Sequence, residues 1–364
     1  MDEEIPDIDG SRPPRLCQQL AGQDAAVGQF MKNLADGRVH HAWILTGAKG
    51  IGKASFAYQA AGFLLHHKNP VAAANDANTL DIPADSESRQ LIKNKTHPDL
   101  MVITRPYDEK KNKFKTAISI DDIRKIRHFF QRTAGMGGWR VCIVDCADEM
   151  TISAANALLK SLEEPPTNAL FFIIAHHPGK LLPTILSRCT QLPLKPVETE
   201  TINRLLVAEK PELDSNAAAA ISYLGNGSIG RALEIADQDG LDVYREMIDL
   251  LAQAPALDIA ALHQFANRVV NRKNEAQFEN FFIFLTEWLH RMVRDSAAGQ
   301  ATPVLFEGEG QAMTGLLANS RLEDWVEVWE KVTALCSSAK ALNLDRKQTV
   351  IECFSLIERA SKAS

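Results

Sequence analysis

Residues 41–55 read HAWILTGAKGIGKAS, and the fold class of the chain depends on this stretch. The run His41–Thr46 is apolar and predicts a buried strand, and the alanine-rich segment Lys53–His67 predicts a helix. Between them lies Gly47-Ala-Lys-Gly-Ile-Gly-Lys53, which has the spacing of a phosphate-binding loop. In such loops backbone amides and the helix N-terminus hold phosphates, and the lysine reaches the outer ones. The sequence therefore predicts a nucleotide loop, and an ordinary strand-to-helix turn is the alternative.

The residue after this lysine departs from the phosphate-loop pattern. Serine or threonine is expected there because its hydroxyl binds magnesium, but this chain has Ala54. Ser55 does not replace that hydroxyl, because one residue along a helix turns the side chain by about 100°. One magnesium ligand is therefore missing.

The run Val141–Asp145 resembles the apolar strand whose last aspartate supplies a second magnesium contact in such sites. The next residue is Cys146, and a neutral thiol cannot activate the attacking water as a glutamate does. Asp148 and Glu149 follow, and we expect them to cap a helix or to be solvated. The pocket is therefore expected to accept ATP or ADP without hydrolysing it. The candidate nucleotide-binding residues are Gly47, Ala48, Gly50, Ile51, Gly52, Lys53, Ala54, Ser55 and Asp145.

The composition indicates a folded protein without a membrane span. The chain has 364 residues, of which 45% are apolar, and its net charge is −6. No run approaches the roughly 18 apolar residues of a membrane helix, and the acidic start lacks the features of a signal peptide. The six cysteines form no CxxC pair, which argues against a zinc knuckle and against a disulfide framework. We predict a cytoplasmic protein of two or three domains, whose nucleic-acid contacts must come from local patches.

Strands and helices alternate along the first half of the chain. Residues 68–99 are expected to form loops with at most one short helix. Further strands are predicted at 100–104, 139–145 and 169–175, the last of the sheet, with helices between them. This alternation implies a parallel sheet covered by helices on both faces, so residues 1–194 are interpreted as one α/β domain.

One of these helices is predicted over residues 119–132. Ser119 or Asp121 can cap it, and Ile123, Ile126 and Phe130 are expected to face inward. Its outer face is basic and carries Arg124, Lys125, Arg127 and Arg132.

The strand signal disappears after Pro193 and Pro196. The remaining sequence has helical periodicity that is broken at 225–230, at 239–240 and at 308–310. Two helical domains are therefore predicted, a small one at 195–240 and a longer one at 241–364.

Six segments, taken in order, resemble one known family. They are HHAWILTGAKGIGKAS at 40–55, THPDL at 96–100, AANALLKSLEEPP at 154–166, SRC at 187–189, GNGSIGRAL at 225–233 and NLDRKQ at 343–348. The chain resembles the delta-prime family of clamp-loader subunits of bacterial DNA polymerase III. The resemblance is close over about residues 20–240, and beyond them it consists of helical character and NLDRKQ.

The resemblance implies an AAA+ nucleotide-binding domain, a small helical lid and an all-α collar domain that joins five subunits in a ring. The implied partners are the gamma/tau and delta subunits, the sliding clamp and, through the complex, primer-template DNA. No membrane is implied. The implied role is to help load the clamp during replication.

In this family the arginine of the SRC triplet projects toward the γ-phosphate of ATP on the adjacent motor subunit. This role maps onto Arg188, between Ser187 and Cys189, and an ordinary surface arginine is the alternative. Such arginine fingers contribute about 10³ to 10⁵ in rate where they have been measured. By the same resemblance, His176 lies near a polar sensor position and Arg231 near a second sensor. Arg231 is displaced by one residue from the pattern of the hydrolysing subunits, so an arginine at a helix N-terminus paired with an acid is an equal alternative.

Many members of this family carry a zinc module of four cysteines, but residues 68–118 here contain no cysteine. No zinc site is therefore predicted. The lysines of this insert are expected to form a solvated loop, with a DNA contact as the alternative. They are Lys110, Lys111, Lys113 and Lys115.

Two other functions are considered. An ATP-hydrolysing loader motor of the gamma/tau type would use Lys53 and Asp145, and Ala54 and Cys146 argue against it. A small-molecule kinase of the phosphate-loop class does not account for the long helical portion after residue 194. The chain itself is therefore not expected to be an active ATPase or polymerase, although a complex that contains it would be an enzyme.

Overall fold

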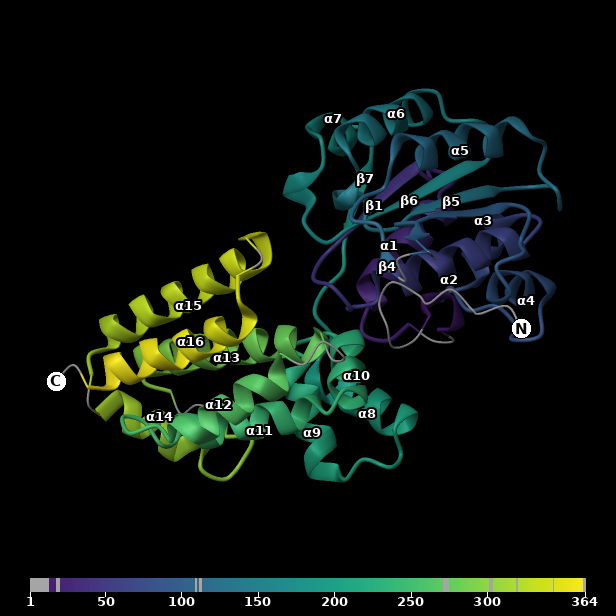
Figure 1. The fold of residues 1–364 in the computed structure, drawn as a ribbon. Coiled ribbons are helices and arrows are strands. Elements are labelled where there is room, and N and C mark those ends of the chain that lie inside the picture. The colour runs from purple at the N-terminus through teal and green to yellow at the C-terminus, as the bar shows by residue number, and fades with distance from the viewer. Residues whose placement is uncertain are drawn as a thin grey trace. The chain divides into compact units, whose positions relative to one another are not determined.

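The structure, a computed structural model, divides into two compact units. The first contains Met1–Glu212 and Gly225–Ala232, and the second contains Leu213–Leu224 and Leu233–Ser364. Figure 1 shows the chain from its N-terminal unit in purple and blue to its C-terminal helices in yellow. The residues that the structure describes are 13–17, 20–108, 110, 113–270, 275–300, 304–318, 320–342 and 344–362.

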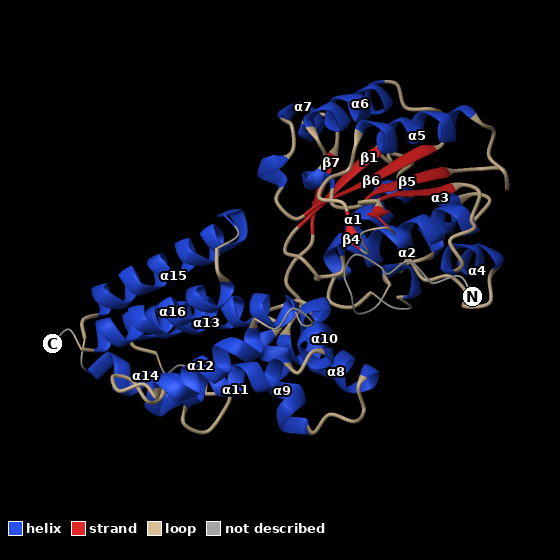
Figure 2. Ribbon diagram, viewed as in Figure 1, coloured by secondary structure: helices blue, strands red, loops and turns tan. Residues whose placement is uncertain are grey.

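A five-stranded parallel sheet forms the centre of the first unit (Figure 2). Its strands lie in the order β2, β5, β6, β1, β7, and each neighbouring pair is parallel. β1 therefore has a hydrogen-bonded neighbour on either side. The strands are β1 (Ala42–Thr46), β2 (Leu100–Ile103), β5 (Arg140–Val144), β6 (Ala169–Ala175) and β7 (Thr190–Pro193).

Helices cover both faces of this sheet, because alternate side chains of each strand point to opposite faces. Trp43 of β1 packs in a cluster with α1 (Asp24–Ala35) and α2 (Lys53–His66), and the rings of Phe30 and Trp43 lie edge to face with centroids 5.3 Å apart. Ile44, the next residue, packs in the cluster on the opposite face with α5 (Ile120–Gln131) and α6 (Ile152–Glu163). The predicted α/β fold with a parallel sheet is therefore confirmed.

Two sequence expectations about secondary structure were wrong. The strand at 169–175 is not the last of the sheet, because β7 pairs with β1 beyond it. β7 has only four residues and ends at Pro193, so it is too short to produce an apolar alternation that a sequence reading can detect. Residues 68–99 contain two short helices, α3 (Pro70–Asp76) and α4 (Glu87–Lys93), where at most one was expected.

The lysine-rich insert contains an antiparallel hairpin that the sequence did not predict. It joins β3 (Tyr107–Asp108) to β4 (Lys113–Phe114), with the rings of Tyr107 and Phe114 5.1 Å apart. Strands of two residues are too short for periodicity to reveal. Lys110 and Lys115 are exposed, and Lys111 lies outside the described residues.

The helix predicted at 119–132 is α5, and Ser119 caps it as expected. The amide and hydroxyl of Ser119 donate hydrogen bonds of 3.1 and 2.6 Å to Asp122 in a capping box. Burial disfavours the charged Asp122 carboxylate, but these bonds and Lys125 outweigh it, and the pKa of Asp122 falls below its usual value. Ile123 and Ile126 are buried and Phe130 is partly buried, as predicted.

Helices alone follow Pro193 within the described residues, as the sequence predicted. α8 belongs to the first unit, α9 to the second, and the division between the units falls within α10. The three-domain division at 194 and 240 stays a prediction. The helices are α8 (Thr199–Glu209), α9 (Ser215–Leu224), α10 (Ile229–Asp237), α11 (Gly240–Leu251), α12 (Ile259–Val269), α13 (Glu275–Ala297), α14 (Glu309–Ala318), α15 (Leu322–Leu342) and α16 (Arg346–Ser361).

A buried polar cluster joins three helices of the second unit. The Tyr244 hydroxyl of α11 donates to Glu309 of α14 at 2.6 Å, and Arg291 of α13 donates to the same hydroxyl at 2.9 Å and pairs with Glu309. Glu309 also accepts the amide of Leu305 at 2.7 Å. The buried charges are thus compensated by one another and by hydrogen bonds, as buried ions require.

None of the helices in the described part of the chain is long and apolar enough to cross a membrane.

Candidate nucleotide loop and arginine finger

The glycine-rich loop leaves β1 at its carboxyl end and enters α2, as predicted. Gly47, Gly50 and Gly52 have φ values of 133°, 76° and 101°. L-residues rarely adopt such values, so the turn requires glycine at these positions. The loop therefore has the strand–turn–helix context that a phosphate loop needs.

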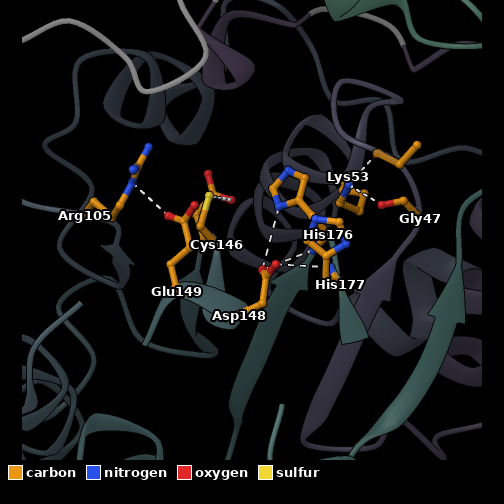
Figure 3. A network of polar contacts seen from close by, with 10 residues as sticks. Gly47, Lys53, Arg105, Cys146, Asp148, Glu149, His176 and His177 are labelled. Atoms are coloured by element: carbon orange, nitrogen blue, oxygen red, sulfur yellow. Dashed lines mark hydrogen bonds and ion pairs between the residues drawn. The ribbon is translucent and has the colours of Figure 1, made fainter. Parts of the chain in front are cut away.

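The side chain of Lys53 points back into its own loop. Its ammonium donates hydrogen bonds to the carbonyl oxygens of Gly47 at 2.8 Å and Ala48 at 2.6 Å (Figure 3). Lys53 is only 3% exposed. The cation that would meet the outer phosphates is therefore already bound to backbone oxygens.

The turn at the start of α10 covers the middle of the loop. The amide of Gly230 donates to the carbonyl of Gly50 at 3.0 Å, and a Cβ added at Gly50 would lie 2.3 Å from Ser228 Oγ. Ser228 Oγ in turn accepts the amide of Arg231 at 3.1 Å. The structure thus brings Arg231, the candidate second sensor, to the loop, although the two are far apart in sequence.

Gln23 also holds the loop, and nothing in the sequence singled it out. Its side-chain nitrogen donates to the carbonyls of Ile51 at 3.0 Å and Lys195 at 2.7 Å, and its oxygen accepts the Lys195 amide at 3.2 Å. Gln23 is 3% exposed. Because its partners lie far along the chain, no local pattern could reveal this contact.

The candidate magnesium-binding positions do not form a complete site. Ala54 packs against the core cluster that contains Trp43, α1 and α2, and it has no hydroxyl. Asp145 follows β5, and the Cys146 thiol lies 3.8 Å from its carboxylate. Together with the bound Lys53 and the turn that covers Gly50, these residues do not fit a magnesium-bound nucleotide as they lie.

Asp148 is not a solvated or helix-capping acid, which corrects the sequence expectation. Its side chain is 3% exposed and accepts the amides of His176 at 3.2 Å and His177 at 3.1 Å, with His176 Nδ1 at 3.8 Å. Burial disfavours the charged form, but these contacts outweigh it and hold the pKa of Asp148 well below its usual range. Glu149 forms an ion pair of 2.8 Å with Arg105, as Figure 3 also shows.

Arg188 lies at the opposite end of the sheet from the loop. It follows α7 (Pro183–Leu186) and precedes β7, whose residue Thr190 pairs with Trp43 near the start of β1. The loop begins at Gly47, after the last residue of β1. At about 3.3 Å per residue, the strand separates the loop from the start of β7 by roughly 13 Å.

The side chain of Arg188 is 37% exposed and ion-pairs with Glu163 at 2.9 Å. Its guanidinium also donates to the carbonyl of Thr184 at 2.9 Å and to the hydroxyl of Ser187 at 3.4 Å. The sequence reading missed Glu163, although it lies in the quoted SLEEPP run. Burial raises the pKa of Cys189 to about 12, so its thiol stays protonated at neutral pH.

Comparison with known proteins shows which family the first half of the chain resembles. The sequence model of the family described as "DNA polymerase III, delta subunit" matches residues 22–198. The delta-prime subunit of DNA polymerase III from Pseudomonas aeruginosa is 37% identical over 192 residues, covering 52% of this chain and 53% of that protein. Over residues 22–198 the chain is similar to the delta-prime subunit family of DNA polymerase III.

Two further relatives are similar over a larger share of the chain. The delta-prime subunit of Escherichia coli is 28% identical, covering 79% of this chain and 80% of that protein. The tau subunit of Salmonella typhimurium is also 28% identical, covering 77% of this chain but only 44% of that protein. The chain spans about half the length of the first curated relatives that it matches.

The matched segment contains most of the candidate site. Residues 22–198 include the loop, Asp145, His176 and Arg188 but end before Arg231.

The contact between the loop and Ser228 predicts that Gly50→Ala destabilises the first unit. A side chain at φ 76° costs about 1–2 kcal/mol, and the collision with Ser228 Oγ adds to that cost. Thermal melting of the variant measures the loss. Gly37→Ala is the matched control, because Gly37 has φ 65° and no atom within 4 Å of the added Cβ. Adding Ser228→Ala to Gly50→Ala should restore part of the difference, and equal losses at positions 37 and 50 would contradict the contact.

The buried Asp148 predicts a pH-dependent contribution to stability. Its folded pKa lies below the unfolded value of about 3.9, so its stabilisation is present above pH 4 and is lost as the pH falls through the folded pKa. Asp148→Asn should therefore cost about 1.5 to 3 kcal/mol at pH 7, and the difference from the wild type should shrink below pH 4. Urea denaturation across this range measures it. Asp121→Asn, at an exposed pair with Arg124, should change stability little at any pH.

Proposed function

We propose that this chain is a clamp-loader subunit that does not hydrolyse ATP itself and offers Arg188 to ATP bound by a neighbouring subunit. The observation that carries the proposal is the position of Arg188 at the opposite end of the sheet from the chain's own loop. An arginine there cannot reach a phosphate held by that loop. Its partly exposed guanidinium can meet a phosphate on another molecule, and its planar fork suits phosphate oxygens.

The state of the chain's own loop supports the absence of hydrolysis. Hydrolysis needs a magnesium hydroxyl ligand, a base for water and a lysine directed at the phosphates. Here Ala54 and Cys146 occupy the first two positions, and the ammonium of Lys53 binds the carbonyls of Gly47 and Ala48. ATP or ADP at this loop would therefore be held without turnover, and only after Lys53 changed its contacts.

The proposed partners follow from the named relatives. We infer that the chain assembles with gamma/tau and delta subunits in a five-subunit ring that acts on a sliding clamp and primer-template DNA. The similarity to delta-prime and tau subunits supports this inference. No membrane is involved in this role.

The alternative is an ATP-hydrolysing motor subunit of the gamma/tau type. The phosphate-loop spacing and Asp145 favour it, as does the 28% identity with a tau subunit. The missing hydroxyl at position 54 and the missing glutamate at position 146 argue against it. The two functions differ in which subunit's ATP is hydrolysed, and two experiments separate them.

The first experiment replaces the proposed finger in the reconstituted loader. Arg188→Ala should reduce turnover at the adjoining ATP site by about 10³-fold or more, so the clamp- and DNA-stimulated ATPase of the complex loses the share of that site. Steady-state phosphate release measures this loss. Arg124→Ala, at an exposed arginine paired with Asp121, is the control and should leave the rate unchanged. An unchanged rate with Arg188→Ala would refute the finger.

The second experiment examines the chain alone. Calorimetry with ATP should give weak binding that magnesium does not strengthen, because Ala54 supplies no ligand for the ion. The isolated chain should release no phosphate from ATP. Steady turnover that Lys53→Ala abolishes would instead establish the motor function.

A further inference from the structure

The guanidinium of Arg188 is already bound to an anion within its own chain. One terminal nitrogen lies 2.9 Å from Oε1 of Glu163, and the other donates to Thr184 O at 2.9 Å. A carboxylate and a phosphate are competing ligands for the same guanidinium fork. An incoming phosphate must therefore displace Glu163 before it can pair with the same nitrogen.

Both ends of this pair are anchored in the fold. The amide of Arg188 donates to Ile185 O at 3.1 Å, and Ile185 is fully buried, so the backbone before β7 is fixed. Glu163 is the last residue of α6, and Pro165 and Pro166 stop that helix just beyond it. The carboxylate is thus held beside the arginine by two elements that pack in the same core cluster.

We propose that Glu163 is a positioning residue that keeps Arg188 in a resting direction and yields it when the neighbouring subunit's ATP arrives. The proposal rests on the proposed finger function of Arg188. The Glu163 side chain is 48% exposed and that of Arg188 37%, so water and salt screen the pair. A weak, screened contact of this kind suits a group that must be exchanged in every cycle.

The size of the effect follows from the exposure of the pair. Exposed ion pairs contribute about 0.4 to 1 kcal/mol, which corresponds to a change of about two- to five-fold in a rate or an affinity. Removing the carboxylate should therefore make Arg188 more available to the neighbour by that factor. Folding stability should be almost unaffected.

The test compares Glu163→Gln with Glu164→Gln in the assembled loader. Glutamine keeps the shape of the side chain and removes its charge, and Glu164 is the exposed neighbour of Glu163. We expect Glu163→Gln to raise the basal Mg-ATP hydrolysis of the complex, without clamp or DNA, by about two- to five-fold at low salt. The increase should fade at about 0.5 M salt, where charges are screened, and Glu163→Asp should return the rate toward the wild type. Glu164→Gln should change nothing.

A second readout does not depend on ATP turnover. In the isolated chain labelled with ¹⁵N-arginine, Glu163→Gln should speed the rotation of the Arg188 guanidinium seen by NMR, and Glu164→Gln should not. An unchanged guanidinium signal, or a basal ATPase that Glu163→Gln leaves unchanged or lowers, would overturn the positioning role.

Combining the variants separates this inference from the function on which it rests. In the Arg188→Ala background, Glu163→Gln should have no further effect, because the group that it controls is absent. If Arg188→Ala lowers the ATPase and Glu163→Gln does not raise it, only the positioning role fails. If Arg188→Ala itself has no effect, the finger function fails and the positioning role falls with it.

Discussion

The parallel pairing of β1 with strands on both sides is the constraint on which the rest of the structure depends. Because all five strands run in one direction, every chain segment that leaves a strand does so at the same end of the sheet. Gly47, Asp145 and His176 therefore gather at the carboxyl end. Glu163 and Arg188 precede β6 and β7 and gather at the amino end. The parallel direction of the strands thus separates the carboxyl end of the sheet, which carries the glycine-rich loop, from the amino end, which carries Arg188.

The glycine-rich loop at the carboxyl end of the sheet packs closely against distant parts of the chain. The carbonyl and Cα of Gly50 lie against the Ser228–Arg231 turn, a distance of approach that any larger residue would prevent. Gln23 ties the same loop to Lys195. Because glycine has no side chain, another backbone segment can pack closely against the loop. A phosphate needs the same open space. The spacing of a phosphate loop can therefore serve close packing within the protein as well as phosphate binding.

Charged side chains differ in burial at the two ends of the sheet. At the carboxyl end Asp148 is buried and accepts two backbone amides, so it ties the segment after β5 to the segment after β6 and is not available to a ligand. At the amino end both members of the Arg188–Glu163 ion pair are partly exposed to solvent. Buried ions resist exchange because desolvation penalises any unpaired state, whereas exposed ions exchange partners at little cost. The exposed ion pair of Arg188 can therefore exchange partners at little cost.

The sequence by itself determined the alternation of strands and helices, the helical second half, the glycine loop and the missing groups at positions 54 and 146. These features are local, since they depend on periodicity, caps and residue type within a few positions of one another. Only the tertiary structure decided that Lys53 folds onto its own loop, that Gln23 and Ser228 hold that loop, and that Glu163 holds Arg188. Except for Lys53, whose carbonyl partners are Gly47 and Ala48 in the same loop, these partners are brought together by the fold across long stretches of chain. β7, which separates Arg188 from the loop, is too short to leave a pattern. Contacts between residues far apart in the chain leave no local pattern in the sequence. Only the fold therefore shows which partner each of these side chains contacts.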